Sequence, residues 1–341
     1  MTHLIVVHPP SPSDEVMFDA PINDSGHAPW IHLRNTLAAI GYEIQTSYRA
    51  ESRLQLAKWV LFMNCPSSLQ PPPKSFKGKI GSWLSNSKEK DLFQRCLQAG
   101  LGDQLALFLW EPEVVVPENF EPSLHRNFAR IFTWHRQLLS QQGRYREILY
   151  PQASGLEVPE SKKFAERKLL VNFSGNKTSP HSLELYSQRV EVIRYMESNH
   201  SEDFDHYGPG WEYGFPLWRG VVPSKHTVYP QYRFGLCYEN MHGVDGYVTE
   251  KIFDCLRAGA VPVYWGAPDI ESYVPADAFV DRRRFASTKS MIDYLNTMQE
   301  SEWQALRSAG LNYLSSVQFS NFLPAAFAQR IINGLELEGA Q

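Results

Sequence analysis

The sequence has little of what marks a metal-binding, nucleic-acid-binding or membrane-spanning protein. Its 341 residues include four cysteines, none of them in a Cys-x-x-Cys pair, and its eleven histidines form no His-Glu-x-x-His motif, so neither common zinc pattern is present. Lys and Arg number 33 against 37 Asp and Glu, without the basic surplus typical of nucleic-acid binders. No run approaches the roughly 18 apolar residues that a membrane-spanning helix requires.

The cysteines and the first residues both favour a reducing compartment. Cys237 and Cys255 lie in apolar strand and helix patterns and are expected to be buried thiols rather than disulfide partners. The opening segment, MTHLIVVHPP, has too short an apolar run and too little positive charge for a secretory signal, and it predicts a first β-strand. We therefore expect a cytoplasmic protein without a transmembrane segment.

Length and periodicity predict two α/β domains. A chain of 341 residues suggests two domains by size, and strands alternate with helices in both halves, as in domains with mostly parallel sheets. Residues 1–150 are predicted to form the first domain and 164–310 the second, joined by a polar linker containing Pro and Gly at 151–163. Residues 311–341 are expected to form a helical tail, and 71–87, rich in Pro, Lys and Ser, an exposed loop.

Polar groups follow several predicted strands. Ligands of open α/β sheets bind at the carboxyl ends of the strands, so these positions are candidate binding residues. They are Glu111 after 105–110, Ser174-Gly175-Asn176 after 169–173, Glu239-Asn240 after 234–238 and Gly266 after 261–265.

The position of Lys251 predicts a bound anion. Thr249 is a good N-cap for a helix that ends before Gly259, and Glu250 suits the positive end of the helix dipole. A lysine in the first turn does not suit it, unless an anion lies between the lysine and the free backbone N–H groups. By itself, an isolated lysine here is more often a solvated surface residue, so the neighbouring residues decide.

Those neighbours closely resemble the signature of the α-1,3/4-fucosyltransferase family. The similar elements are Tyr238-Glu239-Asn240, a Gly-containing loop, Tyr247-Val248-Thr249-Glu250-Lys251 and Gly259-Ala260-Val261-Pro262-Val263-Tyr264-Trp265-Gly266. They occur in order and without gaps, and the resemblance covers about 169–285. It is faint before Asp103.

The resemblance implies a GT-B fold, two Rossmann-like α/β domains facing across a cleft. It also implies an inverting transferase that needs no metal and moves L-fucose from GDP-fucose to a sugar hydroxyl, expected to be α-1,3 to an N-acetylglucosamine-type sugar. The missing anchor suggests a bacterial soluble type, with peripheral membrane contact possible if the glycan acceptor is lipid-linked. Two alternatives remain open: another GDP-linked or 6-deoxy sugar donor, and a non-catalytic sugar-nucleotide-binding protein.

The resemblance also assigns the donor site. Its phosphate-binding arginine corresponds to Arg189, in a predicted helix over 184–195, and its phosphate-binding lysine to Lys251. An arginine suits two phosphate oxygens at once. On the sequence alone, Arg189 would more often be a solvated helix-surface arginine. The remaining donor-pocket candidates are Ser174, Asn176, Glu239, Asn240, Tyr247 and Glu250, the last of which is expected to bind a sugar or ribose hydroxyl.

An inverting transferase also needs a general base, which the family places after a strand of the first domain. The candidates here are Glu111 and Glu113 in Trp110-Glu111-Pro112-Glu113. We favour Glu111 because it directly follows the strand, and burial beside Trp110 would raise the pKa of its carboxyl, which suits a base. The sequence departs from the family's Glu-Ser-Pro context, so Glu113 stays an alternative.

One pair of acids matches a metal-binding pattern of another glycosyltransferase architecture. Asp203 and Asp205 flank Phe204, and the next strand is expected to begin at His206, so the pair precedes a strand instead of following one. We expect no metal site there.

Overall fold

The protein, described here from a computed structural model, divides into two compact units. The structure describes residues 3–19, 27–69, 92–153, 159 and 162–338. The first unit holds the described residues up to Leu149 together with those from Pro324 onward, and the second holds Tyr150–Leu323. The predicted loop 71–87 and residues 154–158, 160 and 161 of the predicted linker lie outside the described residues.

The first unit is built on a parallel sheet of six strands in the order β2-β1-β3-β4-β5-β6. Its central strands are mostly apolar and buried because both faces of the sheet are covered. The strands are β1 (His3–His8), β2 (Tyr42–Thr46), β3 (Ala57–Phe62), β4 (Leu105–Phe108), β5 (Arg130–Thr133) and β6 (Tyr145–Glu147). Its helices are α1 (Ala28–Ala39), a helical turn at 92–98, α3 (Pro122–His125), α4 (Arg136–Leu139) and α10 (Pro324–Gly334).

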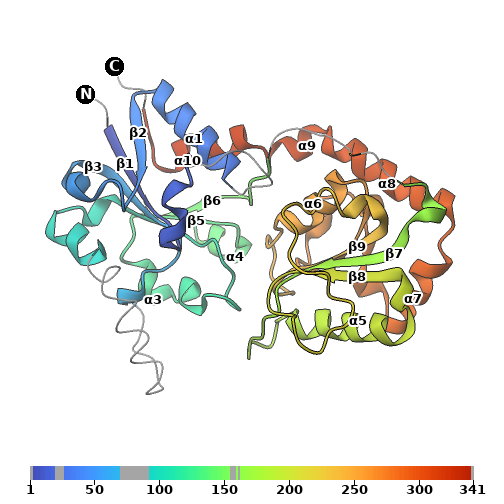
Figure 1. Cartoon of the computed structure of the whole chain (residues 1–341). Helices are drawn as coiled ribbons and strands as arrows, with labels where there is room; N and C mark the ends of the chain where they lie inside the picture. Colours follow the sequence, from blue (N-terminus) through green and yellow to red (C-terminus); the bar gives the residue numbers. More distant parts are fainter. Residues whose placement is uncertain (1–2, 20–26, 70–91, 154–158, 160–161, 339–341) are drawn as a thin grey trace. The chain divides into compact units, whose positions relative to one another are not determined.

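The helix α10 completes the core of the first unit from the far end of the chain. It packs on α1, and the rings of Trp30 and Phe327 meet edge-on with centroids 5.0 Å apart (Figure 1). Gly334 lies so close to the sheet that a Cβ there would be 2.4 Å from the ring of Phe132. Residues 324–338, which the sequence places in a helical tail, thus contribute to the first hydrophobic core.

The second unit has a parallel sheet of five strands in the order β11-β10-β9-β7-β8. The helices α5 and α7 pack together, as do α6 and α8, and the two pairs cover opposite faces of the sheet (Figure 1). The strands are β7 (Lys168–Phe173), β8 (Phe204–Tyr207), β9 (Tyr232–Tyr238), β10 (Val261–Trp265) and β11 (Val280–Asp281). The helices are α5 (Tyr186–Asn199), α6 (Glu250–Arg257), α7 (Thr288–Thr297), α8 (Glu300–Leu314) and α9 (Val317–Ser320). The prediction of two parallel-sheet α/β domains is confirmed.

The strand order gives each sheet a switch point, the position at which open α/β sheets bind ligands. In the second unit β8 and β9 lie on opposite sides of β7, so the chain reverses its direction of travel across the sheet between β7 and β9. In open α/β sheets ligands bind at such a switch point, outside the carboxyl ends of the strands. Ser174 and Glu239-Asn240 follow these two strands. The corresponding point in the first unit lies between β1 and β3.

None of the helices within the described ranges is both long and apolar enough to cross a membrane.

Candidate active site

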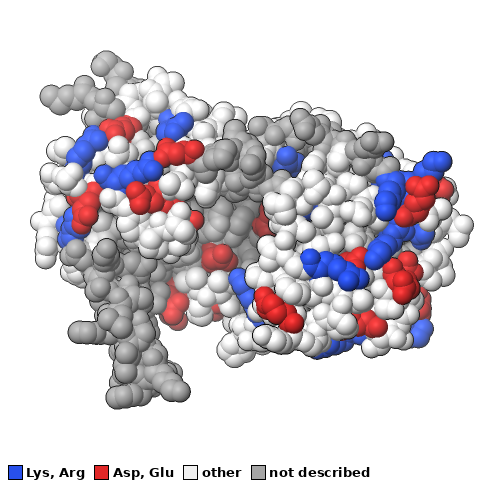
Figure 2. All heavy atoms as spheres, in the orientation of Figure 1, with Lys and Arg blue, Asp and Glu red and all other residues white. Residues whose placement is uncertain are grey.

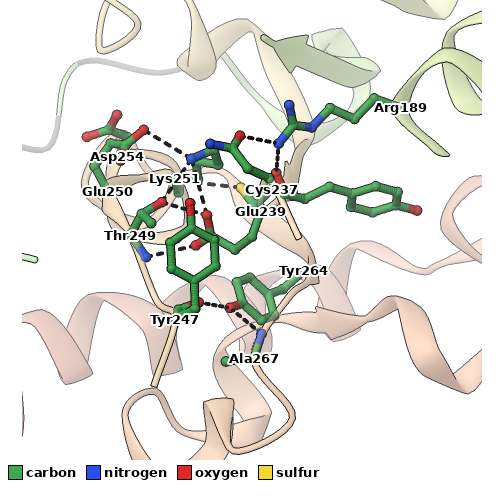
Figure 3. A network of polar contacts seen from close by, with 12 residues as sticks. Arg189, Cys237, Glu239, Tyr247, Thr249, Glu250, Lys251, Asp254, Tyr264 and Ala267 are labelled. Atoms are coloured by element: carbon green, nitrogen blue, oxygen red, sulfur yellow. Dashed lines mark hydrogen bonds and ion pairs between the residues drawn. The ribbon is translucent and has the colours of Figure 1, made fainter. Parts of the chain in front are cut away.

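The centre of the site in the second unit is a buried ion pair between Glu239 and Lys251. Glu239, directly after β9, is fully buried, and its Oε2 lies 3.2 Å from Lys251 Nζ. The same carboxylate accepts hydrogen bonds from the Thr249 backbone N–H, at 2.8 Å, and from the Thr249 hydroxyl, at 2.6 Å. Lys251 Nζ in turn donates to Thr249 Oγ1 at 2.9 Å (Figure 3). These bonds fix the start of α6 against the end of β9.

Thr249 holds the N-cap position of α6, as predicted, but it does not cap the helix with its side chain. Its hydroxyl donates to Glu239 instead of accepting a hydrogen bond from the first turn. The hydroxyl is used for the Glu239 carboxylate because a buried carboxylate with an unpaired oxygen would cost more free energy than an uncapped helix start. The first N–H groups of α6 are therefore not covered by the side chain expected to cover them, which suits an anion-binding helix N-terminus.

Charges alternate outward from Lys251. Its Nζ lies 3.4 Å from Glu250 Oε1, and Lys225 Nζ lies 2.9 Å from Asp254 Oδ2. Burial raises the pKa of the Glu250 carboxyl, but the charges of Lys251 and Lys225 outweigh it and lower that pKa to about 2. The pKa of Lys251 is lowered by burial but raised more by Glu239 and Glu250, for a net rise. Both groups are charged at neutral pH.

Arg189 joins this cluster from α5. It is 4% exposed, so it is not the solvated surface arginine that the sequence alone favours. Its Nη2 donates to the Tyr238 carbonyl at 2.8 Å and to Asn240 Oδ1 at 3.0 Å, which places the guanidinium at the switch point beside β9. Within the described ranges no carboxylate lies within ion-pair distance of it. Burial lowers the pKa of Arg189, with Glu239 opposing this.

Arg189 and Lys251 thus lie in one polar network (Figure 3). The two charges are close enough to interact, since the charge of Arg189 lowers the pKa of Lys251. A buried arginine and a half-buried lysine that repel one another at the end of a parallel strand form an arrangement that a diphosphate would stabilise.

The close approach of the Gly266 backbone to Glu239 makes room for the buried carboxylate. Gly266 follows β10, and a Cβ on it would lie 2.5 Å from both Glu239 Cγ and the Tyr264 hydroxyl. The Glu239 N–H also bonds to the Trp265 carbonyl at 2.8 Å. Gly266, a predicted strand-end position, therefore makes room for Glu239.

Ser174 and Asn176 lie at the end of β7 but bond to a different loop. The Ser174 carbonyl accepts from the indole of Trp211 at 2.6 Å, and Asn176 Nδ2 donates to the Gly210 carbonyl at 2.8 Å. Gly208 has a φ of +130°, and a Cβ on it would be 2.1 Å from the Ser174 carbonyl oxygen. These two predicted donor-site residues thus bind the loop after β8, and no bond joins them to Arg189 or Lys251 in the described structure.

Tyr247 is buried, and its carbonyl accepts from the Tyr264 hydroxyl at 3.4 Å. The loop before it turns through Gly243 and Gly246, both with positive φ, and the Gly246 N–H donates to Asp269. Both glycines therefore serve the turn that leads into Tyr247.

In the first unit, Glu111 is held by its backbone. Its N–H donates to Asn64 Oδ1 at 3.4 Å, and its carbonyl accepts from Asn119 Nδ2 at 3.1 Å. Asn119 is fully buried and also donates to Asn64 Oδ1, at 2.8 Å, while its Oδ1 accepts from the Cys65 N–H. This network ties the segment after β4 to the end of β3 and places Glu111 at the carboxyl edge of the sheet.

The acids of the Asp-x-Asp pattern have separate structural positions. Asp205 lies within β8, which begins at Phe204 and not at His206 as predicted. It pairs with Lys168 at 2.6 Å and Arg219 at 2.5 Å and accepts from the Tyr232 hydroxyl. These partners lower the pKa of Asp205 against the effect of burial. Asp203, by contrast, is exposed.

Sequence reasoning missed the contributions of Lys225, Asp254 and Asn119. Asp254 faces Lys225 from the second turn of α6, but 29 residues separate the pair in the chain. Asn119 lies in a short 3-10 helix, Pro117–Phe120, between Glu118 and Phe120, and this local sequence gave no sign that its side chain would be buried. An acidic residue inside an otherwise apolar helical face was the one available signal, and it pointed to Asp254.

Comparison with known proteins finds a family match within the second unit. Residues 167–307 match the model described as glycosyltransferase family 10 (fucosyltransferase) C-term. The chain is 39% identical over 74 residues to an α-(1,3)-fucosyltransferase, FucT, of Helicobacter pylori, which is 22% of this chain and 15% of that protein. The chain thus aligns with well under two thirds of that relative's length.

Solved structures extend the likeness to both units at the level of the fold. An α1,3-fucosyltransferase solved with GDP-fucose has a TM-score of 0.58 at 15% identity, covering 99% of this chain and 92% of that one. An α-glucosyltransferase in complex with UDP-glucose and DNA has a TM-score of 0.55 at 9% identity, with 98% of each chain covered. The GT-B prediction is confirmed, and glycosyltransferases with different sugar nucleotides share the fold.

Proposed function

Residues 167–307 match the model of the fucosyltransferase C-terminal domain of glycosyltransferase family 10, and on that premise we propose that the protein transfers L-fucose from GDP-fucose to a hydroxyl of a glycan acceptor. The observation that carries this proposal is the placement of Arg189 and Lys251 in one network at the switch point of the second unit. The proposed linkage is α-1,3 to an N-acetylglucosamine-type sugar, as the family resemblance implies.

The two cations have a direct role in the proposed reaction. As the bond between fucose and phosphate breaks, negative charge grows on the departing GDP. Cations and N–H groups that are already in place lower the barrier when they bind this charge more strongly in the transition state than in the ground state. Arg189 is held by Tyr238 and Asn240, and Lys251 by Glu239 and Thr249, so neither has to be reorganised during the reaction.

Glu250 is proposed to bind hydroxyl groups of the donor. Its side chain is 44% exposed, whereas Glu239 is fully buried, so only the former is accessible to a ligand. Because its pKa is about 2, Glu250 is an acceptor of hydrogen bonds throughout the neutral range. Glu239 is better described as the residue that positions Lys251 than as a donor contact.

Glu111 is proposed as the general base that takes the proton of the attacking acceptor hydroxyl. The backbone N–H and carbonyl of Glu111 are bound by Asn64 and Asn119, which supports Glu111 as a group with a defined position. Inversion then follows from attack opposite the diphosphate, without a covalent intermediate. A cation pair already serves the diphosphate, so we propose that no metal is required.

The test is transfer from a panel of labelled sugar nucleotides, GDP-fucose, GDP-mannose, UDP-glucose and UDP-galactose, with and without EDTA. We expect transfer from GDP-fucose alone and no effect of EDTA. Transfer from another nucleotide in place of GDP-fucose would assign a different donor, and GDP binding without any transfer would favour a non-catalytic binding protein.

Variants separate the two proposed roles. Glu111→Gln should lower kcat by about 10²–10⁴-fold while leaving GDP affinity unchanged, as for loss of a general base. Glu113→Gln is the matched control and should retain turnover. Arg189→Gln should weaken GDP binding by about tenfold or more, the effect of a lost charge-assisted hydrogen bond. Normal turnover in Glu111→Gln would refute the base assignment.

A further inference from the structure

A cationic pocket lies at the amino ends of the strands in the second unit, away from the candidate active site. It is a cavity of about 300 Å³, and the residues that line it include Lys162, Lys163, Arg167, Glu300, Trp303 and Arg307. Figure 2 shows several Lys and Arg side chains, with Asp and Glu side chains among them, on the end of this unit where Figure 1 places the starts of β7 and α8. Four of the six residues are cationic and one is acidic.

The pocket is separate from the candidate active site. Arg167 immediately precedes β7, and it bonds to the carbonyls of Tyr232, the first residue of β9, and Gly259, which lies just before β10. These are the amino ends of the strands, whereas Asn240 follows the carboxyl end of β9. The seven residues of β9, at about 3.3 Å each, put roughly 20 Å between the two edges.

Two guanidinium groups lie close together in this pocket without an acidic partner. Arg167 is 4% exposed, and neither it nor Arg307 forms an ion pair within the described parts of the chain. Their guanidinium carbons lie 4.7 and 5.8 Å from the ring centre of Trp303, which is itself buried. Burial and the charge of Arg307 lower the pKa of Arg167 to about 10, so both arginines stay charged and repel each other at neutral pH.

Part of this arrangement has a structural explanation. Arg167 Nη1 and Arg307 Nε both donate to the Gly259 carbonyl, just beyond the carboxyl end of α6, where cations are favourable. Arg167 also donates from Nε to the Lys162 carbonyl. Binding of the α6 carboxyl end by the two arginines does not require Lys162 or Lys163, whose side chains are exposed beside the same cavity. It also does not explain why the cavity itself is open.

We propose that this pocket binds a phosphate group. Phosphate would place negative charge between Arg307 and the two lysines, relieve the repulsion between the arginines, and accept the charge-assisted hydrogen bonds that they have free. Trp303 forms an apolar floor beside the charged groups, which suits a phosphate attached to an organic part. The chemistry is common to a soluble phosphate ester and to an anionic lipid headgroup.

Inorganic phosphate is the probe that tests the site, by calorimetric titration with and without saturating GDP. We expect binding that persists in saturating GDP, because GDP is proposed to bind at the carboxyl ends of the strands. The double variant Lys162→Gln, Arg307→Gln should weaken this binding by about tenfold or more. Arg167 is left unchanged because its three carbonyl bonds stabilise the fold. The matched control is Lys289→Gln, an exposed lysine of α7 paired with Asp293, and it should bind phosphate like the wild type.

Vesicle sedimentation distinguishes the two sources of phosphate. Binding to vesicles of phosphatidylcholine with phosphatidylglycerol but not to phosphatidylcholine alone, lost in the double variant, would assign a lipid headgroup. Phosphate binding without vesicle binding would assign a soluble ligand. The proposal is overturned if the wild type binds neither probe, if GDP abolishes phosphate binding, or if the double variant binds as the wild type does. None of these readouts uses sugar transfer, so their failure is distinct from failure of the proposed function.

Discussion

Lys251 Nζ lies 3.2 Å from Oε2 of Glu239, and the carboxylate is fully buried while the lysine side chain is 17% exposed. The pair therefore combines two roles. Glu239 needs a counter-charge to remain buried, and Lys251 needs a fixed position to meet a phosphate. Stability and ligand binding are linked through the same two side chains.

A double-mutant cycle separates these roles. Lys251→Met should lower the free energy of unfolding by about 3–5 kcal/mol, because it leaves a buried carboxylate without its partner. The double variant Lys251→Met, Glu239→Gln should recover much of that loss while GDP binding stays weak. Urea denaturation and GDP titration of the four proteins measure both. Recovery of GDP binding in the double variant would contradict a phosphate role for Lys251.

Glu250 should make stability depend on pH in the acid range. Its pKa is lowered from 4.5 to about 2 in the folded protein, so its contribution is fully present above pH 4.5 and is lost as the pH falls through about 2. We expect the free energy of unfolding to fall less steeply over this range in Glu250→Gln than in the wild type. Urea denaturation at several pH values gives the difference, and parallel curves would show that Glu250 is not held by the two lysines.

Asn119→Ala should affect catalysis more than donor binding. The substitution removes the bonds to Asn64, to the Glu111 carbonyl and from the Cys65 N–H, and leaves these buried or half-buried groups without that partner, at a cost of about 1–3 kcal/mol. We expect kcat to fall and GDP affinity to stay the same, because GDP is proposed to bind the second unit. Asn127→Ala, which removes one local bond to Leu124, is the control and should leave kcat unchanged.

Gly266→Ala should disturb the buried pair without changing any charge. The new methyl group would lie 2.5 Å from Glu239 Cγ and must displace it, at a cost of about 1–3 kcal/mol. We expect lower stability together with weaker GDP binding. Gly102→Ala, where the nearest atom would be 3.8 Å away, serves as the control for substitution of a glycine. Wild-type GDP affinity in Gly266→Ala would show that Glu239 does not position the phosphate-binding groups.

The sequence predicted the fold and the centre of the site because both depend on local patterns. Apolar strands followed by polar residues identified the carboxyl edges of the sheets, and Thr249 marked the start of α6. The strand order and the switch point required the structure, since pairing between strands such as β7 and β9, which are 64 residues apart at their starts, leaves no local pattern.

The sequence could not assign the separate roles of adjacent side chains. Glu239 and Glu250 both appeared to be donor contacts, yet one is enclosed by Thr249 and Lys251 and the other is accessible. Burial of Glu239 depends on the missing side chain of Gly266, a contact between two different strand ends. The positions of Ser174 and Asn176 likewise depend on a loop that begins more than 30 residues later.

The location of α10 has a consequence for synthesis of the protein. Phe327, Ile331 and Leu335 belong to the first hydrophobic core, but the ribosome makes them after the whole of the second unit. Until then the early part of the chain has one apolar face of its sheet covered by α1 but not by α10, and this partly uncovered face is exposed to aggregation or to a chaperone while the later part is able to fold first.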